Sequence, residues 1–76
     1  MLGFLQRKHN DELDALLSEV TRNASNNYKD AAQKAFKDFR EKHDELLSAG
    51  RLNDKQTEYY RAVISKLEVE LKNFRH

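Results

Sequence analysis

The sequence predicts an all-α protein that folds as an antiparallel three-helix bundle. Apolar residues recur at steps of three and four in three separate segments, which is the spacing of one helix face. Proline is absent and glycine occurs only at Gly3 and Gly50, so few residues interrupt a helix. The pattern breaks only at 23–27 and 50–53, and such short connections make neighbouring helices antiparallel. We expect helices over about residues 3–22, 27–49 and 54–73, in a single domain covering residues 1–76.

The first predicted helix covers about residues 3–22, because one apolar stripe continues through His9. A shorter helix capped by Asn10 is the alternative, since an asparagine side chain can accept from the free N–H groups of a first helical turn. Residues 1–9 would then be loose. Continuity of the stripe through His9 favours the longer helix. The stripe consists of Leu2, Leu5, His9, Leu13, Leu16, Val20 and Ala24.

The central helix, about residues 27–49, carries the stripe against which the other two are expected to pack. Asn26 or Asn27 can cap its start, because asparagine is favoured at helix N-termini and in turns. Gly50 can adopt the left-handed conformation that commonly ends a helix. The stripe consists of Tyr28, Ala32, Ala35, Phe36, Phe39, His43, Leu46 and Leu47.

The third helix is expected over about residues 54–73. Asn53 can cap it, and Gln56 can reach back to the backbone of Asn53, an arrangement known as a capping box. Its apolar stripe consists of Tyr60, Val63, Ile64, Leu67, Leu71 and Phe74.

The three stripes agree in register if both connections are tight turns. Leu13 then lies beside Phe39, and Val20 lies beside Leu71. Large and small side chains alternate between these layers, as close packing requires. We therefore expect Leu13, Phe39 and Leu67 to be buried.

The overall composition gives little indication of a charged partner or a redox site. Fourteen Lys and Arg residues nearly balance thirteen Asp and Glu residues, so the chain has no strong field for nucleic acid or a membrane surface. The sequence contains no cysteine, which excludes disulfides and thiolate ligands within it. Its longest apolar cluster, Met1–Leu5, is too short to span a bilayer or to act as a secretory signal. We expect a cytoplasmic protein without a membrane span.

No sequence motif indicates catalysis or a bound cofactor. The serines lack a recognisable base and acid arrangement, and neither a nucleophile elbow nor a phosphate-binding loop occurs. Carboxylate pairs fall on predicted helix surfaces, where solvation explains them. We expect no enzymatic activity, no cofactor and no metal site.

His9, His43 and Tyr60 are predicted to share one layer of the bundle. A metal site there would need a further ligand, for which Glu12 or Asp44 is the nearest candidate. A structural layer of packed rings is the favoured interpretation. Because protonation would place two like charges together, the same layer is a candidate pH-sensitive site whose stability falls on acidification.

Two groups of basic residues are the candidates for a nucleic-acid interface. Acidic residues interrupt both groups, and intrahelical ion pairs dilute their charge. An accessory nucleic-acid-binding protein is therefore the alternative function rather than the preferred one. The groups are Lys34, Lys37 and Arg40, and Arg51, Lys55 and Arg61.

The preferred function is a small helical protein–protein interaction module, an adaptor or regulator that binds another protein or a second copy of itself. Several large apolar residues lie off the predicted core stripes, and exposed apolar surface on a small domain favours such contacts. Tyr59, next to Tyr60, is the strongest candidate. The predicted interaction surface consists of Phe4, Tyr59, Val63 and Val69.

Overall fold

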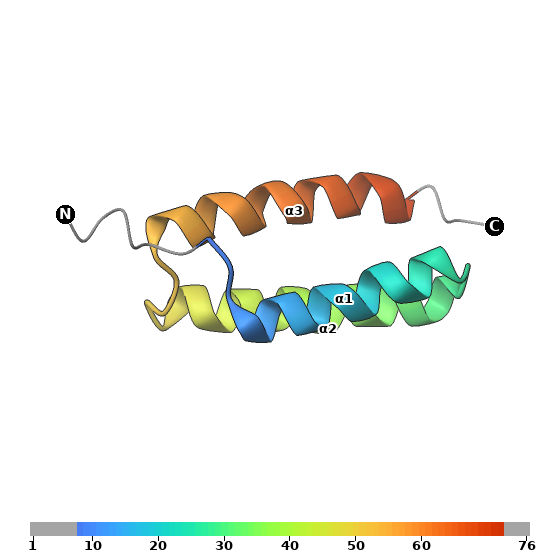
Figure 1. Ribbon diagram of the computed structural model, residues 1–76, viewed down its shortest axis with the longest axis horizontal. Helices are drawn as coiled ribbons and strands as arrows, with labels where there is room; N and C mark the ends of the chain where they lie inside the picture. Colours follow the sequence, from blue (N-terminus) through green and yellow to red (C-terminus); the bar gives the residue numbers. More distant parts are fainter. Residues whose placement is uncertain (1–7, 73–76) are drawn as a thin grey trace.

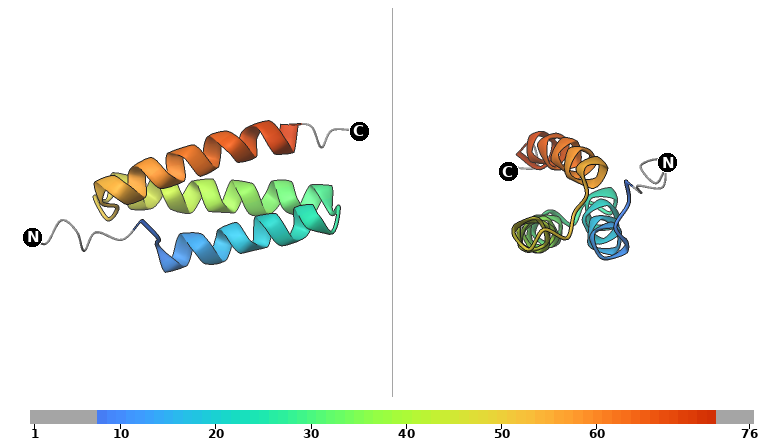
Figure 2. Two further views of the ribbon diagram at one scale, coloured as in Figure 1. Left: turned by 45° about the horizontal axis from the view of Figure 1, so that its top comes forward. Right: turned by 90° about the vertical axis from the view of Figure 1, so that its left-hand side faces the viewer.

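The computed structural model describes residues 8–72 and contains three helices in this range (Figure 1). They are α1 (Asp11–Ser25), α2 (Lys29–Ser48) and α3 (Asp54–Lys72). Helices α1 and α2 form an antiparallel hairpin, and α3 runs back along it. Seen from one end, the three helices occupy the corners of a triangle (Figure 2). The predicted three-helix bundle is confirmed.

The core lies along the centre of this triangle and contains residues from all three helices. Leu13 and Phe39 are fully buried and Leu67 is 7% exposed, as predicted. Two members of the predicted central stripe are not part of the core, since Tyr28 is 61% and Leu47 is 42% exposed. Tyr28 is the N-cap of α2, and Leu47 lies at the edge of the stripe, next to the buried Leu46. The buried hydrophobic residues are Leu13, Val20, Ala32, Phe36, Phe39, Leu46, Tyr60, Leu67 and Leu71.

Helix α1 begins at Asp11, so the predicted long helix that included His9 is wrong for the described residues. Asn10 is the N-cap, with an extended backbone and a side chain that accepts a hydrogen bond from the Leu13 N–H at 3.0 Å. This bond satisfies a free donor of the first turn, which stabilises a start at this position. The alternative capped at Asn10 is the correct one, and residues 3–7 lie outside the described range. The helix ends at Ser25, later than predicted.

The first turn uses Asn27 in the left-handed conformation, with φ of 62°. The Asn27 N–H donates to the Ala24 carbonyl and the Tyr28 N–H donates to the Asn23 carbonyl, at 3.0 and 2.9 Å. These two bonds form a Schellman motif, in which an asparagine replaces the usual glycine. Tyr28 is the N-cap of α2 and its side chain makes no capping bond. The predicted cap by Asn26 or Asn27 is therefore wrong, because Asn27 ends α1 rather than starting α2.

The second turn has the same construction, with Gly50 in the left-handed position as predicted. Gly50 has a φ of 70°, its N–H donates to the Leu47 carbonyl, and the Arg51 N–H donates to the Leu46 carbonyl. The capping box that follows is also confirmed. The Gln56 N–H donates to Asn53 Oδ1 at 2.8 Å, and the Asn53 N–H donates to Gln56 Oε1 at 2.9 Å. Local chemistry thus determines both ends of this connection.

Helices α1 and α2 approach each other more closely than α3 approaches either (Figure 2). Small residues of α2 explain the close pair, since Ala32 is fully buried and Ala35 packs against the core. Larger rings fill the space towards α3. The Phe39 and Tyr60 rings lie 6.1 Å apart, and the Phe36 and Phe39 rings lie 6.4 Å apart. Helix α3 therefore rests on a layer of aromatic side chains.

Candidate functional site

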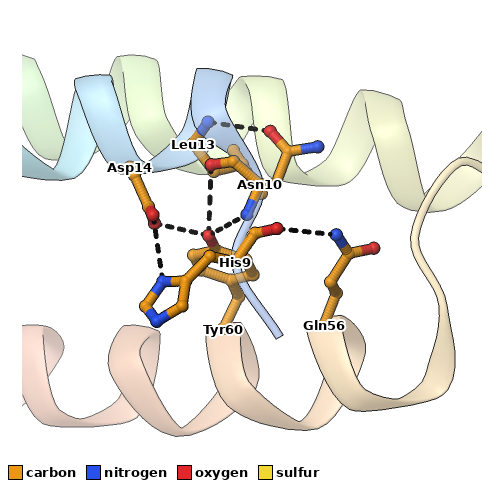
Figure 3. A network of polar contacts seen from close by, with 6 residues as sticks. All are labelled: His9, Asn10, Leu13, Asp14, Gln56 and Tyr60. Atoms are coloured by element: carbon orange, nitrogen blue, oxygen red, sulfur yellow. Dashed lines mark hydrogen bonds and ion pairs between the residues drawn. The ribbon is translucent and has the colours of Figure 1, made fainter. Parts of the chain in front are cut away.

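The most elaborate polar arrangement joins the start of α1 to α3 and centres on the hydroxyl of Tyr60 (Figure 3). The Tyr60 side chain is fully buried, but its hydroxyl group still has hydrogen-bond partners. It donates to Asp14 Oδ1 at 2.5 Å and accepts from the Asn10 N–H at 2.7 Å. We call this arrangement the Tyr60 network; it consists of His9, Asn10, Asp14, Gln56 and Tyr60.

The outer part of the Tyr60 network holds the segment that precedes α1. Asp14 Oδ2 lies 2.9 Å from His9 Nδ1, so this carboxylate bridges a phenol and an imidazole. Gln56 Nε2 donates to the His9 carbonyl at 3.0 Å. The His9 ring also contacts the edge of Tyr59, with ring centres 4.9 Å apart. Residues 9 and 10 are therefore attached to α3 by backbone and side-chain contacts together.

The surroundings of Tyr60 in this network determine the protonation state of its hydroxyl group. Burial raises the pKa of Tyr60 above its ordinary value, and the hydrogen bond to Asp14 raises it further. Both effects disfavour the phenolate, which would be poorly hydrated and would also face a carboxylate. The Tyr60 hydroxyl thus keeps its proton and remains a donor to Asp14.

The sequence predicted a shared layer of His9, His43 and Tyr60, and the structure joins two of these residues, His9 and Tyr60, through Asp14. His9 precedes α1 with its side chain 46% exposed, so the helical register that placed it opposite His43 loses its basis. His43 is 7% exposed on α2, with Nδ1 3.1 Å from Asp44 Oδ1. Its Nε2 is buried and has no hydrogen-bond partner. A pH effect of the two histidines stays a prediction, which urea unfolding of a His9→Gln/His43→Gln variant at neutral and mildly acidic pH would check.

The groups of the Tyr60 network are suited to a structural role, which is to hold the segment before α1 against α3. Both oxygens of Asp14 already have partners, Tyr60 and His9. Within residues 8–72, no group of three His, Asp or Glu side chains could hold a metal ion. Sequence reasoning identified Tyr60 and His9 but missed their link through Asp14. The one available signal was the alternative N-cap at Asn10, which brings the preceding residue towards α3.

The predicted basic groups are partly neutralised by ion pairs. Lys34 Nζ lies 3.2 Å from Asp38 Oδ2 on the same helix. Arg40 Nη1 lies 2.7 Å from Glu68 Oε2 and so joins α2 to α3. The charges of Lys34 and Arg40 are therefore balanced locally. The residues of the second group, Arg51, Lys55 and Arg61, are exposed around the α2–α3 connection and the start of α3.

The predicted interaction surface is only partly exposed. Tyr59 and Val63 are half-buried and pack against the core. Tyr59 also lies under Lys8, whose Nζ is 5.3 Å from the ring centre. Val69 is 63% exposed, and it points about 80° away from Tyr59 around the helix axis. Phe4 lies outside the described residues.

Val69 belongs to a different face of α3, directed away from the other two helices. Ala62 and Ser65 are also exposed, and their spacing of three and seven residues places all three on one line. We call this line, formed by Ala62, Ser65 and Val69, the outer seam. It is a narrow face of small and apolar side chains without a role in the core.

Comparisons with known proteins give no further assignment: no family model, curated protein or solved structure matches the chain significantly. Among the described residues, none of the helices has the length and apolar character needed to cross a membrane.

Proposed function

We propose that this protein is a small interaction module, an adaptor or regulator that binds another protein or a second copy of itself. The observation that supports this most is Val69, a large apolar side chain that is 63% exposed on the outer seam of α3. Exposing a valine to this extent contributes nothing to the core, whereas covering it with a partner removes apolar area from water. The small neighbours Ala62 and Ser65 would let a partner helix approach closely.

Nucleic-acid binding is the weaker alternative because of how charges are paired. Lys34 and Arg40, two of the three residues in the first predicted basic group, each have an acidic partner within 3.2 Å. Phosphate contacts would compete with these ion pairs, which lowers the net gain. A titration of salt against duplex and single-stranded oligonucleotides separates the two functions, since phosphate contacts produce a steep salt dependence.

The test of the interaction module compares two variants of the tagged chain purified from its native cells. Val69→Glu places a charge on the outer seam, and we expect it to abolish co-purification of a specific partner. Ser18→Glu, on the exposed surface of α1, is the matched control and should retain that partner. Circular dichroism should show equal helix content in both.

Retention of the same partner by Val69→Glu would contradict the role of the outer seam. Steeply salt-dependent binding to oligonucleotides, without any protein partner, would favour the alternative function instead. The proposal includes a cytoplasmic location, which fluorescence microscopy of the tagged chain would check.

A further inference from the structure

We propose that α3 exchanges between two copies of this chain, so that the α1–α2 hairpin of one copy receives α3 of the other. The inference goes beyond the proposed function, because it concerns the site that α3 occupies on the hairpin and does not use the outer seam. In the monomer, α3 occupies its own hairpin. In the exchanged dimer, each hairpin would hold the same helix supplied by its partner.

The α1–α2 hairpin has the features of a unit that keeps its form when α3 leaves. Its two helices lie closest together in the bundle (Figure 2), and Ala32 of α2 is fully buried. Lys42 Nζ lies 3.3 Å from Glu12 Oε2, an ion pair that joins α1 and α2 directly. The Schellman motif at Asn27 closes their connection without any contribution from α3. None of these contacts requires α3.

The contacts that hold α3 identify its occupant as another copy of the same helix. Tyr60 inserts between the helices and bonds to Asn10 and Asp14 of the α1 side. Further along, Glu68 pairs with Arg40 of α2 at 2.7 Å. Near the end of α3, Gln33 Nε2 donates to the Leu71 carbonyl at 3.0 Å. A second copy's α3 offers all of these groups at the same spacing, so the exchanged dimer recovers every one of them.

The connection between α2 and α3 is suited to serve as the hinge. Gly50 has a φ of 70°, and a Cβ at this position would meet no atom within 4 Å. Glycine also occupies extended conformations readily, so opening the hinge does not strain this residue. Opening loses the two backbone bonds from Gly50 and Arg51 to the end of α2. In the closed monomer, the connection holds α3 at a high effective concentration near its own hairpin. Exchange between chains therefore competes only when the protein concentration is itself on the order of millimolar.

Cross-linking between chains tests the exchange directly, because the natural sequence has no cysteine. Two single variants, Arg40→Cys and Glu68→Cys, are mixed, unfolded in urea and refolded at roughly 1 mM. The dimer fraction is then isolated by size-exclusion chromatography and treated with a short bis-maleimide. Each variant refolded alone is the control. Circular dichroism checks that both variants fold.

The exchange predicts a covalent heterodimer in the mixed dimer fraction, several times more abundant than the covalent product of either control. In that dimer, position 40 of one chain faces position 68 of the other. A dimer formed by intact bundles side by side keeps positions 40 and 68 of each chain together, so the thiols of different chains would not be linked. A dimer without this cross-link would overturn the proposal.

A hinge variant gives a second, independent measurement. Alanine disfavours the left-handed conformation of Gly50 in the monomer but not an extended hinge, so Gly50→Ala should lower the dimer dissociation constant about tenfold or more. Val69→Glu should leave that constant unchanged, because the outer seam faces away from the hairpin. If both the parent and the Gly50→Ala variant remained monomeric at roughly 1 mM, the proposed exchange would be overturned. Specific capture of another protein would in that case leave the proposed interaction module standing.

Discussion

Replacing Tyr60 with phenylalanine removes one oxygen atom and leaves the ring in the core. The lost hydroxyl group donates to the Asp14 carboxylate at 2.5 Å and accepts from the Asn10 N–H at 2.7 Å. A hydrogen bond to a charged group contributes about 1.5–3 kcal/mol and a neutral one about 0.5–1.5 kcal/mol. Asp14 is 37% exposed and regains water in the variant, which offsets part of the loss. We expect Tyr60→Phe to lower the free energy of unfolding by about 2–3 kcal/mol.

Urea unfolding followed by circular dichroism measures this difference. Tyr59→Phe is the matched control, because Tyr59 is adjacent, half-buried and outside the hydroxyl network; its effect should stay within about 0.5 kcal/mol. A double-mutant cycle of Tyr60→Phe with Asp14→Asn should give a coupling of about 1–2 kcal/mol. If Tyr60→Phe were as stable as Tyr59→Phe, the Tyr60 hydroxyl would not stabilise the fold. If the effects of Tyr60→Phe and Asp14→Asn simply added, the hydroxyl would not act through Asp14.

Two further predictions follow from the buried rings. Because the pKa of Tyr60 is raised in the folded chain, the unfolded chain loses this proton first, so the associated stability is complete below about pH 10 and declines as the pH rises further. Unfolding measured across this range should therefore show a steeper alkaline loss for the parent than for Tyr60→Phe, and equal slopes would contradict it. Phe39→Ala should lower the free energy of unfolding by about 3–5 kcal/mol, whereas Val69→Ala should change it by less than about 0.5 kcal/mol. An unchanged melting temperature for Phe39→Ala would show that Phe39 is not in the core.

The parts of the fold that the sequence predicted correctly depend on neighbouring residues. The spacing of apolar residues determines which face of each helix is buried, and Asn53 and Gln56 cap α3 across only three positions. Gly50 was recognisable because few other residues tolerate its backbone conformation. Such signals lie within one or two helical turns, so a single sequence is sufficient to detect them.

The errors arose where two local signals competed or where the partner was distant in sequence. The apolar stripe continues through His9, but capping by Asn10 determined the start of α1. Asn27 could cap α2 or end α1, and composition alone does not distinguish the two uses. The Tyr60 network depends on residues 46 and 50 positions apart, Asp14 and Asn10 respectively. No local pattern pairs a core tyrosine with a particular carboxylate on another helix.

The attachment of the segment before α1 to α3 is the central structural claim, and amide hydrogen exchange at Asn10 tests it most directly. Asn10 precedes the helix, so its N–H has no intrahelical acceptor, but it donates to the buried Tyr60 hydroxyl at 2.7 Å. We expect this amide to exchange slowly, together with core amides of α1, and to exchange much faster in Tyr60→Phe. An Asn10 amide that exchanges in the parent as fast as an unfolded chain would contradict the attachment.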